Sequence, residues 1–550
     1  MQSPVQPTSL PAPASALDHP RYSFLIALGV ALLALTWQLG VRGLNEPDEG
    51  RYASVAFEMV RSGDWVVPHF QGMPHLTKPP LFYWLTALQL KAFGVNPWAA
   101  RLVPTLAALG TLMLVWSLAF RWWGPRQALY ATLLLLTAPL FFVIARLCDP
   151  NMLLTFWVTL GGWAALRWQD EGKSRHRALY YLAHGLAFLT KGPVGCILIL
   201  LGQLAFRCFG SDGRPHRRLW WWPGFLLALT LGLSWYLLMI VNQPDRLDYF
   251  LRYELFDRVF TSVHKRSEPF WFFWAVLPAA FLPWLPVLAT FRAPSWSALR
   301  ARYPEGGLLF HVLLITLFFS LSKSKLPTYI LPALPPLALL AAAQLRYDER
   351  HGRHFRWAKR LVALLAILLP AIMIGIGQAK AHPSHWLHGA TVLSAVVLVF
   401  LLLRLKRCPP HRWLLPAAGL ILIAYVTLLD VVRRHERAMF GESTEELMAD
   451  WRRASPGQPG PFFYTHAPAG LLFYLHRSDP PQRLPLVKTN AVLASADYVE
   501  QLTRHLEDLR GQHAYVMASS YHLNRVTGSV ARLPARALVQ DRKYTILLTP

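Results

Sequence analysis

The sequence predicts an α-helical polytopic membrane protein of about thirteen transmembrane helices, followed by a small C-terminal α/β domain. The composition points to a membrane protein, because 54% of the 550 residues are hydrophobic and 15% are charged, whereas a soluble protein has about 25% charged residues. Apolar segments of membrane-spanning length also alternate with short polar loops. Ordinary soluble polarity returns near the C-terminus. The predicted domains are a disordered tail at 1–21, a transmembrane domain at 22–432 and an α/β domain at 433–550.

The predicted spans approach the roughly 17–25 apolar residues that a helix needs to cross a bilayer. They are 22–41, 99–120, 128–145, 150–166, 178–189, 193–206, 219–241, 270–291, 306–321, 326–345, 357–377, 386–403 and 413–432. Residues 81–93 are apolar but short, so we interpret them as a re-entrant or juxtamembrane helix in the loop at 44–98. The Pro-rich start lacks the basic region and cleavage site of a signal peptide, so we expect the first span to be retained.

Basic residues predict the orientation of these spans. They cluster in alternate loops, at 121–126, 167–177, 207–218, 292–302, 346–360 and 404–412, and the intervening connections carry few charges. The positive-inside rule places the basic loops and the N-terminus in the cytoplasm and the C-terminus outside. This requires that 43–101 makes no net crossing. The alternative is fourteen spans with 81–93 included, which would put several basic loops on the outer side.

The net charge of +25 admits nucleic-acid binding, but short basic loops between apolar segments fit anionic lipid headgroups better. The four cysteines are scattered without a CxxC pair, so we expect neither a disulfide framework nor a zinc site. The chain has no P-loop or dinucleotide fingerprint, which disfavours nucleotide-driven transport.

The C-terminal region carries signals of a soluble α/β domain. Ser443 to Glu446 resembles a capping box that opens a helix. Residues 495–509 have helical periodicity, and 461–464, 514–517 and 544–548 are expected to be strands.

The candidate site residues are the charges that remain in the charge-poor outer loops. Asp48 and Glu49 directly follow the first span, and charged groups there are costly in lipid, so they are functional candidates. A carboxylate can act as a base or metal ligand, and a lysine or arginine can hold a phosphate. Asp149 begins the fourth span. The candidate phosphate-binding residues are Arg51, Lys78, Tyr83, Arg258, Arg266, Lys325 and Tyr329.

Each candidate also has a structural alternative. An isolated lysine can snorkel or set topology, and Tyr83 and Tyr329 can be interface aromatics. His264 is a candidate ligand for a divalent metal together with Asp48, or else a surface histidine. A divalent metal ion is therefore an open cofactor prediction.

Four sequence runs resemble a known family. The run EPDEGRY from Glu46 to Tyr52 is similar to the first-loop acidic motif of polytopic lipid-linked glycosyltransferases of the protein-mannosyltransferase (GT-C) type. The runs KPPLFYW from Lys78, LTKGP from Leu189 and KSKLPTYILP from Lys323 resemble more specifically the bacterial aminoarabinose transferases that modify lipid A. The resemblance extends over nearly the whole chain.

The resemblance implies a bacterial inner-membrane glycosyltransferase with its site and C-terminal domain in the periplasm. The implied donor is undecaprenyl phosphate-linked 4-amino-4-deoxy-L-arabinose, the acceptor a phosphate of lipid A, and the outcome resistance to polymyxin and cationic peptides. Asp48 would be the carboxylate that acts on the acceptor or sugar, and Lys78 with Arg51 would hold the carrier phosphate. Asp149 resembles a second acidic position of the superfamily.

A mechanism follows from the chemistry of these partners. An acceptor phosphate needs little deprotonation, so the difficult step is loss of undecaprenyl phosphate from the anomeric carbon. Cations that stabilise the leaving phosphate would supply most of the catalysis, and we expect a single inverting displacement. The alternatives are a protein O-mannosyltransferase-like enzyme using another polyprenyl-phosphate sugar, and a lipid-linked-sugar flippase, although matched inverted halves are not apparent.

Overall fold

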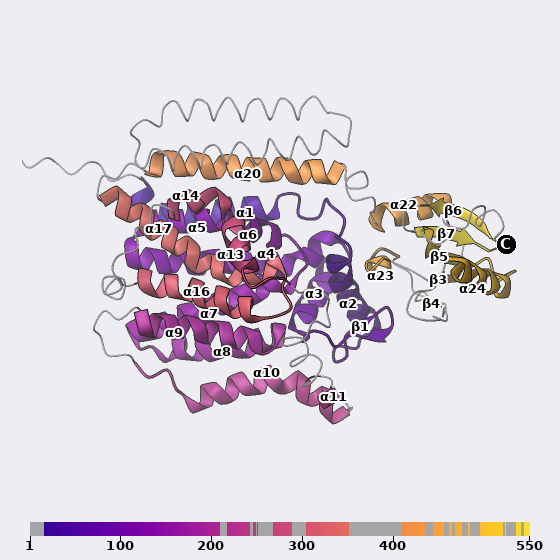
Figure 1. Ribbon diagram of the computed structural model, residues 1–550, viewed down its shortest axis with the longest axis horizontal. Helices are drawn as coiled ribbons and strands as arrows, with labels where there is room; N and C mark the ends of the chain where they lie inside the picture. The colour runs from indigo at the N-terminus through magenta and orange to yellow at the C-terminus, as the bar shows by residue number, and fades with distance from the viewer. Residues whose placement is uncertain are drawn as a thin grey trace, which may run out of the picture.

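Figure 1 shows a bundle of long, roughly parallel helices, with a smaller sheet-containing unit beyond one end. The structure is a computed structural model. It describes residues 16–209, 217–242, 246–248, 250, 268–288, 304–350, 410–434, 444–455, 461–464, 468–475, 482–483, 495–520, 523, 535–540 and 544–549.

Long helices make up the bundle. They are α1 (Pro20–Thr36), α4 (Pro97–Trp123), α5 (Pro125–Leu136), α7 (Pro150–Glu171), α8 (Ser174–Lys191), α9 (Pro193–Phe209), α10 (Trp222–Asn242), α16 (Glu305–Leu321), α17 (Leu334–Arg350) and α20 (Pro410–Arg434). The shorter elements are η1 (Ala16–Asp18), α6 (Pro139–Ile144), α11 (Arg246–Asp248), α13 (Phe272–Ala280), η3 (Leu282–Trp284), α14 (Leu285–Leu288) and η4 (Pro327–Ala333). Within the described residues, Pro97–Trp123, Trp222–Asn242 and Pro327–Glu349 are long and apolar enough to cross a membrane.

Three predicted spans are not single helices. The span at 128–145 breaks between α5 and α6, where Pro139 begins the second helix. The span at 270–291 divides into α13, η3 and α14 over its described part. The span at 326–345 starts as the 3₁₀ helix η4 before α17. Proline explains these breaks, because it lacks the N–H that a helix interior needs and its ring clashes with the preceding turn. The predicted spans 357–377 and 386–403 lie outside the described residues.

The first loop builds a compact cap at one end of the bundle. It contains α2 (Asp48–Ser62), the antiparallel pair β1 (His69–Phe70) and β2 (Met73–Pro74), and α3 (Leu81–Phe93). The apolar segment predicted at 81–93 is thus a helix with those bounds, and Figure 1 shows α2 and α3 together at the bundle end. Arg101 near the start of α4 donates hydrogen bonds to the carbonyls of Leu39 and Gly43 after α1. The loop therefore starts and finishes at the same end of the bundle.

The C-terminal unit contains a five-stranded sheet in the order β4-β3-β5-β7-β6. The strands are β3 (Phe462–Tyr464), β4 (Gln482–Arg483), β5 (Tyr515–Ser519), β6 (Arg536–Gln540) and β7 (Tyr544–Leu548), and the helices are α22 (Thr444–Ala454), α23 (Leu471–Leu475) and α24 (Ser495–Asp508). Strand β3 pairs in parallel with β4 and β5, whereas β7 runs antiparallel to β5 and β6. The three predicted strands and the helix predicted at 495–509 are present. Strands β4 and β6 were not predicted.

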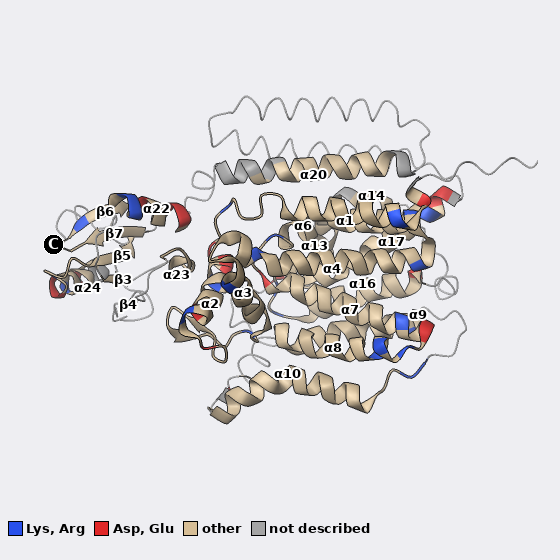
Figure 2. Cartoon of the chain, turned by 180° about the vertical axis from the view of Figure 1, so that it is seen from behind, with Lys and Arg blue, Asp and Glu red and all other residues tan. Residues whose placement is uncertain are grey.

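Charges separate toward the two ends of the bundle. In Figure 2, several basic residues, with some acidic ones among them, lie at the bundle end far from α2, α3 and the C-terminal unit. Three ion pairs at that end join different helices: Arg121 to Asp170 at 2.6 Å, and Arg126 to Asp18 at 2.6 Å and Glu349 at 3.1 Å. The opposite end carries the first-loop cap.

Candidate active site

The first turn of α2 presents two charged side chains to solvent. Asp48 and Arg51 lie three residues apart on one helix face and form an ion pair of 2.6 Å. The side chain of Asp48 is 61% exposed and that of Arg51 is 30% exposed. An acidic residue is favoured here because the N-terminus of a helix carries partial positive charge. Both groups are therefore available to a ligand.

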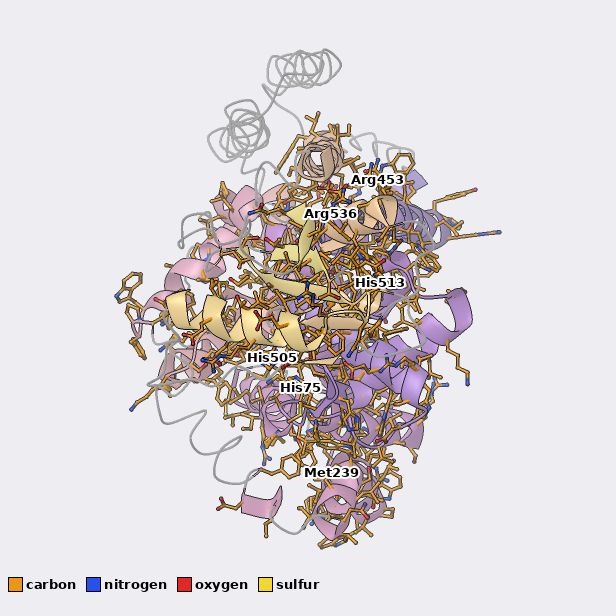
Figure 3. All side chains as sticks on the ribbon, turned by 90° about the vertical axis from the view of Figure 1, so that its right-hand side faces the viewer. His75, Met239, Arg453, His505, His513 and Arg536 are labelled. Atoms are coloured by element: carbon orange, nitrogen blue, oxygen red, sulfur yellow. The ribbon has the colours of Figure 1, made fainter. Side chains whose placement is uncertain are left out.

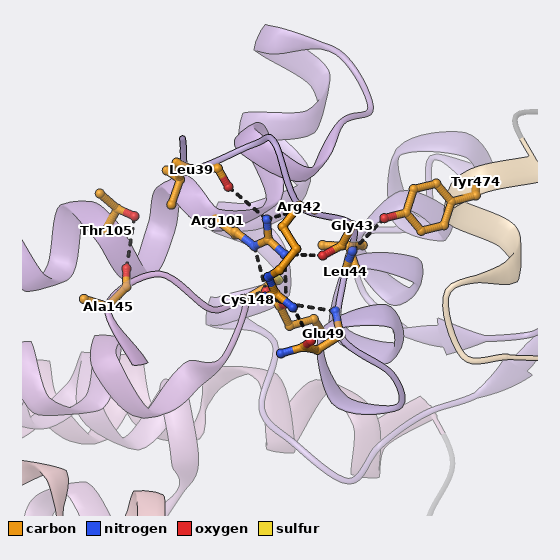
Figure 4. Close-up of polar contacts among 11 residues, drawn as sticks. Leu39, Arg42, Gly43, Leu44, Glu49, Arg101, Thr105, Ala145, Cys148 and Tyr474 are labelled. Carbon is orange, nitrogen blue, oxygen red and sulfur yellow. Dashed lines mark hydrogen bonds and ion pairs between the residues drawn. The ribbon is translucent and has the colours of Figure 1, made fainter. Parts of the chain in front are cut away.

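Glu49 faces the opposite way, into the protein (Figure 4). Its side chain is 3% exposed and accepts hydrogen bonds from the Nε and the Nη2 of Arg101, each at 2.9 Å. The side chain of Arg101 is 1% exposed. Arg42 donates a third hydrogen bond at 2.9 Å. The backbone N–H groups of Asn45 and Cys148 donate two more, at 2.9 and 2.7 Å. Glu49 was predicted as a catalytic carboxylate, but here its two oxygens are occupied by five donors of the protein itself.

Electrostatics explain why Glu49 stays ionised. Burial alone would raise its pKa, but the charge and hydrogen bonds of Arg101, the charge of Arg42 and the N–H of Asn45 outweigh burial and lower the pKa to about 2. A buried carboxylate is tolerated only when it is paired in this way. Glu49 thus anchors the first turn of α2 to the start of α4 and to the residue before Asp149.

Tyr52, one turn into the same helix, is a common neighbour of the candidate residues. Its ring packs against Phe82 and Tyr83 of α3, with centroids 5.6 and 6.0 Å apart, and the guanidinium of Arg51 lies 5.3 Å from its centroid. Burial raises the pKa of Tyr52, and the negative charges of Asp149 and Asp48 raise it further. Because these charges act on one hydroxyl, the carboxylates from α2 and from the start of α7 lie near each other.

The loop before α3 adds Lys78 and a residue that the sequence analysis missed, His75. The ring of His75 lies 6.4 Å from that of Tyr83, and its Nε2 is 2.9 Å from the hydroxyl of Thr77. Burial lowers the pKa of His75 to about 4, and the charges of Arg51 and Lys78 contribute to this lowering. Two cations therefore converge on this loop. Figure 3 looks onto this end of the molecule and labels His75 on the same face as His505 and His513 of the C-terminal unit.

Asp149 caps the N-terminus of α7, where its Oδ1 accepts the N–H of Asn151 at 2.7 Å. The side chain of Asn151 receives a hydrogen bond from Lys191 of α8 and donates one of 3.2 Å to Thr328 of η4. Burial raises the pKa of Asp149, and the nearby charge of Asp48 adds to it, despite the opposing effects of Asn151 and Lys191. Three separate elements meet at this point.

Lys191 of α8 and Tyr329 of η4 form one side of this site. The Nζ of Lys191 lies 4.2 Å from the ring centroid of Tyr329, a cation–π contact. Lys325, in the preceding run, donates a hydrogen bond of 2.9 Å to the carbonyl of Glu268. Arg258, His264 and Arg266, also predicted as site residues, lie outside the described residues.

The structure thus gathers most of the described candidates around Tyr52. Asp48, Arg51, Lys78, Tyr83, Asp149 and Tyr329 come together there, joined by His75, Asn151 and Lys191. Asn151 had a sequence signal, a polar residue in the first turn of an apolar helix after Asp149-Pro150. His75 stands three residues before Lys78, without a pattern of its own.

The described residues do not by themselves fit a divalent metal. In the described ranges, no three histidine, cysteine, aspartate or glutamate side chains are grouped as a metal ion requires. Asp48 and Asp149 are two oxygen donors, but Asp48 is already paired with Arg51, and Lys191 acts on Asp149. A cation cluster of this kind suits an anionic ligand better than a metal cation.

Comparisons with known proteins agree with this architecture. Residues 77–237 match the family model described as dolichyl-phosphate-mannose-protein mannosyltransferase. The chain has a TM-score of 0.74 against the crystal structure of ArnT from Cupriavidus metallidurans bound to undecaprenyl phosphate, at 23% identity, covering 96% of this chain and 97% of that one. That likeness confirms the α-helical fold of this glycosyltransferase type.

Two curated relatives carry one name, undecaprenyl phosphate-alpha-4-amino-4-deoxy-L-arabinose arabinosyl transferase. The one from Pseudomonas fluorescens (strain Pf0-1), numbered 2, is 31% identical over 418 residues, which is 73% of this chain and 75% of the relative. The one from Edwardsiella ictaluri is 33% identical over 376 residues, 65% of this chain and 66% of the relative. The chain therefore belongs to the family of undecaprenyl phosphate-aminoarabinose arabinosyl transferases.

Proposed function

We propose that this protein is an integral membrane glycosyltransferase that moves 4-amino-4-deoxy-L-arabinose from undecaprenyl phosphate to a phosphate of lipid A. Membership of the family supports the donor, because the relatives are named for undecaprenyl phosphate and this sugar. The lipid A acceptor and resistance to polymyxin and cationic peptides follow from that activity. The apolar helices support a location in the bacterial inner membrane.

The observation that carries the proposal is the cluster of cations and carboxylates at the first-loop end of the bundle. Arg51 of α2 pairs with Asp48 and acts on Tyr52, and Lys191 of α8 acts on Asp149. Lys78, in the loop before α3, acts together with Arg51 on His75. A reaction between two phosphate-bearing lipids needs positive charge for both phosphates. It also needs negative charge near the sugar carbon, where positive charge develops in the transition state.

The transfer is a single displacement in which the electrons balance without a general base. An oxygen of the acceptor phosphate attacks the anomeric carbon and forms the new glycosidic bond. The bond from that carbon to the carrier phosphate breaks, and its electron pair leaves on undecaprenyl phosphate. Lys78 and Arg51 hold the leaving phosphate, so that its growing charge meets preorganised donors.

The carboxylates of Asp48 and Asp149 differ in role from that of Glu49. Asp48 and Asp149 stabilise positive charge on the sugar during the displacement, and they also suit the amino group of this sugar as a cation. Asp48 further orients Arg51 through their 2.6 Å ion pair. Glu49 is a positioning residue: it fixes the backbone next to Asp48 and next to Asp149 through its bonds with Arg101 and with the N–H of Cys148.

Orientation follows from the separation of charge. The basic end of the bundle faces the cytoplasm by the positive-inside rule, so the first-loop end and the C-terminal unit face the periplasm. The return of the first loop to its starting end, fixed by Arg101, supports an odd number of spans, about thirteen. This orientation places the site on the periplasmic side of the membrane.

A divalent ion remains a separate proposal, in which Asp48 would be one ligand and His264, outside the described residues, another. Such an ion would supply charge stabilisation to a phosphate. The displacement above runs without it, through the side chains of this chain alone.

Mass spectrometry of the products tests the proposed function. Purified protein in detergent, given the aminoarabinose donor and lipid A, is expected to add one pentosamine mass to lipid A, and cells lacking the protein should lose that species. A flippase would show no turnover without a second compartment, and a mannosyltransferase-like enzyme would use a mannose donor and a protein acceptor. Either of those results would overturn the proposal.

A further inference from the structure

The C-terminal unit contacts the first loop at the base of the active site. Glu46, two residues before Asp48, lies between the two parts. Its Oε1 accepts a hydrogen bond from the hydroxyl of Thr444 at the start of α22 and another from the N–H of Gly470, each at 2.8 Å. These partners are about four hundred residues away in sequence, so the contact exists only in the folded chain.

Two further hydrogen bonds flank Glu46. The hydroxyl of Tyr474 in α23 accepts the N–H of Leu44 at 2.7 Å, on the side that precedes the helix. The hydroxyl of Ser54 in α2 donates to the carbonyl of Ala469 at 2.8 Å, on the side that follows it. Contacts from 468–475 therefore extend over the segment from Leu44 to Ser54, which includes Asp48 and Arg51.

The contact is too close for a side chain at its centre. A Cβ at Gly50 would come within 2.6 Å of both carboxylate oxygens of Glu46 and within 2.7 Å of the backbone nitrogen of Gly470. A Cβ at Gly470 would come within 2.6 Å of Glu46 Oε1. The backbones at Gly50 and Gly470 thus both pack against the carboxylate of Glu46. This close contact leaves little conformational freedom for the first turn of α2.

The first turn of α2 is then held from two directions. Glu49 ties it to Arg101 of the bundle, and Glu46 ties it to the C-terminal unit. Asp48 and Arg51 remain on the exposed face of that turn. A turn fixed on both sides presents its charged groups with little conformational freedom, which is what preorganised catalysis needs.

We propose that the C-terminal unit is a working part of the active site, and that Glu46 is the positioning residue through which it fixes Asp48 and Arg51. The contact of Glu46, Thr444, Gly470 and Tyr474 is called here the latch. This inference rests on the proposed function for its kinetic consequence, but the latch itself is a property of the fold. Without it, the first turn of α2 loses its anchor to the C-terminal unit at Glu46, and the charges at 48 and 51 lose their alignment.

Three variants at two latch residues test this proposal in the purified full-length protein. Glu46→Ala removes both hydrogen bonds and should lower kcat by about 10- to 100-fold, because a misplacement near 1 Å costs that much, while KM for the donor changes less than about threefold. Glu46→Gln retains a carbonyl oxygen as acceptor and should restore kcat to within about threefold of wild type. Tyr474→Phe removes only one hydroxyl and should lower kcat by less than Glu46→Ala.

The matched control is Glu500→Gln, which removes an exposed carboxylate of α24 in the same unit, paired with Arg504, and should leave kcat unchanged. Wild-type kcat in Glu46→Ala would overturn the latch. Equal loss in Glu46→Gln and Glu46→Ala would also overturn it, because the charge itself would then be needed. If Glu46→Ala does not fold, the kcat of Tyr474→Phe tests the latch instead. A wild-type kcat in Tyr474→Phe would then overturn the latch.

A measurement without substrate separates the latch from the proposed function. Amide hydrogen exchange of Leu44 and Gly470 should be faster in Glu46→Ala than in wild type, with the amides of α4 unchanged. Unchanged exchange would overturn the latch even if the enzyme is active. If the wild-type protein fails to transfer aminoarabinose, the proposed function falls, and exchange at these two amides still decides whether the latch exists.

Discussion

At the scale of residues, neighbouring carboxylates have opposite environments. Asp48 is 61% exposed and faces the cations of the site, whereas Glu49 is 3% exposed and its oxygens are occupied by internal donors. Successive residues of an α-helix are rotated by about 100° about the helix axis. One side chain therefore points to the site and the next points into the protein. Adjacent positions in the acidic motif therefore have different surroundings, and we propose that Asp48 binds substrate while Glu49 holds the helix in place.

Asp48→Asn and Glu49→Gln should separate these roles. Asp48→Asn is expected to remove nearly all transfer with little change in thermal stability, because an exposed ion pair contributes only about 0–1 kcal/mol. Glu49→Gln should destabilise the protein by about 3–5 kcal/mol, because it leaves Arg101 buried without its partner. Turnover and thermal unfolding in detergent measure both. Normal turnover in Asp48→Asn would remove the main support for the site.

Chelation tests the role of Asp48 from a second direction. If Asp48, which is paired with Arg51, acts directly on the acceptor or the sugar, turnover should be unchanged in EDTA. Loss of turnover that returns with a divalent ion would instead assign Asp48 and His264 to a metal site.

Lys78→Ala should abolish transfer while leaving the fold intact. Removing the cation that pairs with the bound carrier phosphate costs about 2–5 kcal/mol, which lowers turnover by orders of magnitude. The control is Lys91→Ala at the exposed end of α3, which should transfer normally. Wild-type levels of modified lipid A in Lys78→Ala would contradict the assignment of the carrier phosphate.

The pH dependence should reflect Asp149. Burial and the charge of Asp48 raise its pKa above the usual value, so this carboxyl takes up a proton at higher pH than an ordinary aspartate, whose pKa is about 3.9. If its ionised form is needed, kcat/KM falls as pH decreases through the raised pKa. Asp149→Asn preserves the helix cap, and its residual kcat/KM should lack this fall at low pH, the acidic limb of the pH profile. A limb that persists in Asp149→Asn would assign it to another group.

At the scale of elements, close helix packing in the bundle depends on glycine. A Cβ at Gly161 of α7 would come within 2.8 Å of the buried Ile199 of α9, and one at Gly195 of α9 within 2.6 Å of Ala187 of α8. Small residues let helices approach where lipid offers no hydrophobic drive for association. Helix α7 carries Asp149 and Asn151 at its start, and α8 carries Lys191 at its end. The spacing of α7 and α8, which both pack against α9, therefore sets the geometry of the site.

Gly161→Val and Gly162→Val form a matched pair on one helix. Gly161→Val should force α7 and α9 apart and lower the unfolding temperature, because overpacking costs about 1–3 kcal/mol. A Cβ at Gly162 would meet nothing within 4 Å, so Gly162→Val should have little effect. Thermal unfolding in detergent compares the two, and equal shifts would show that the α7–α9 contact does not limit stability.

At the scale of the whole molecule, charge and fold agree on the direction of insertion. The ion pairs that Arg121 and Arg126 form lie at one end of the bundle, and the first-loop cap and C-terminal unit lie at the other. Such a separation orients a polytopic protein with its basic end in the cytoplasm. We therefore propose that the site opens to the compartment opposite the basic loops.

Reporter fusions test this orientation. A reporter after Pro550 should be active in the periplasm, and one inserted at 350–356 should be cytoplasmic, because basic loops remain inside. A cytoplasmic C-terminus would mean that the number of spans is even, and that the first loop or another segment crosses once more than proposed.

The sequence by itself determined the membrane class and the family, and it predicted candidate site residues that the fold then placed near one another. Apolar length, alternating basic loops and the acidic motif are local properties, and each has a direct physical meaning in lipid. Helix α3 and strand β7 have their predicted bounds for the same reason. The candidates Asp48, Arg51, Lys78 and Asp149 were predicted in the same way, because a charge in an apolar context is conspicuous without a fold.

The tertiary structure alone decided which neighbours these residues have. The sequence could not distinguish Asp48 from Glu49, since burial of the second depends on Arg101, about fifty residues later. It did not reveal His75, whose role depends on the positions of Arg51 and Lys78. Nor could it reveal the latch at Glu46, because a contact between Glu46 and Gly470 depends on long-range packing. Patterns along a chain record solvent and helix geometry, whereas partners distant in sequence are set only when the chain folds.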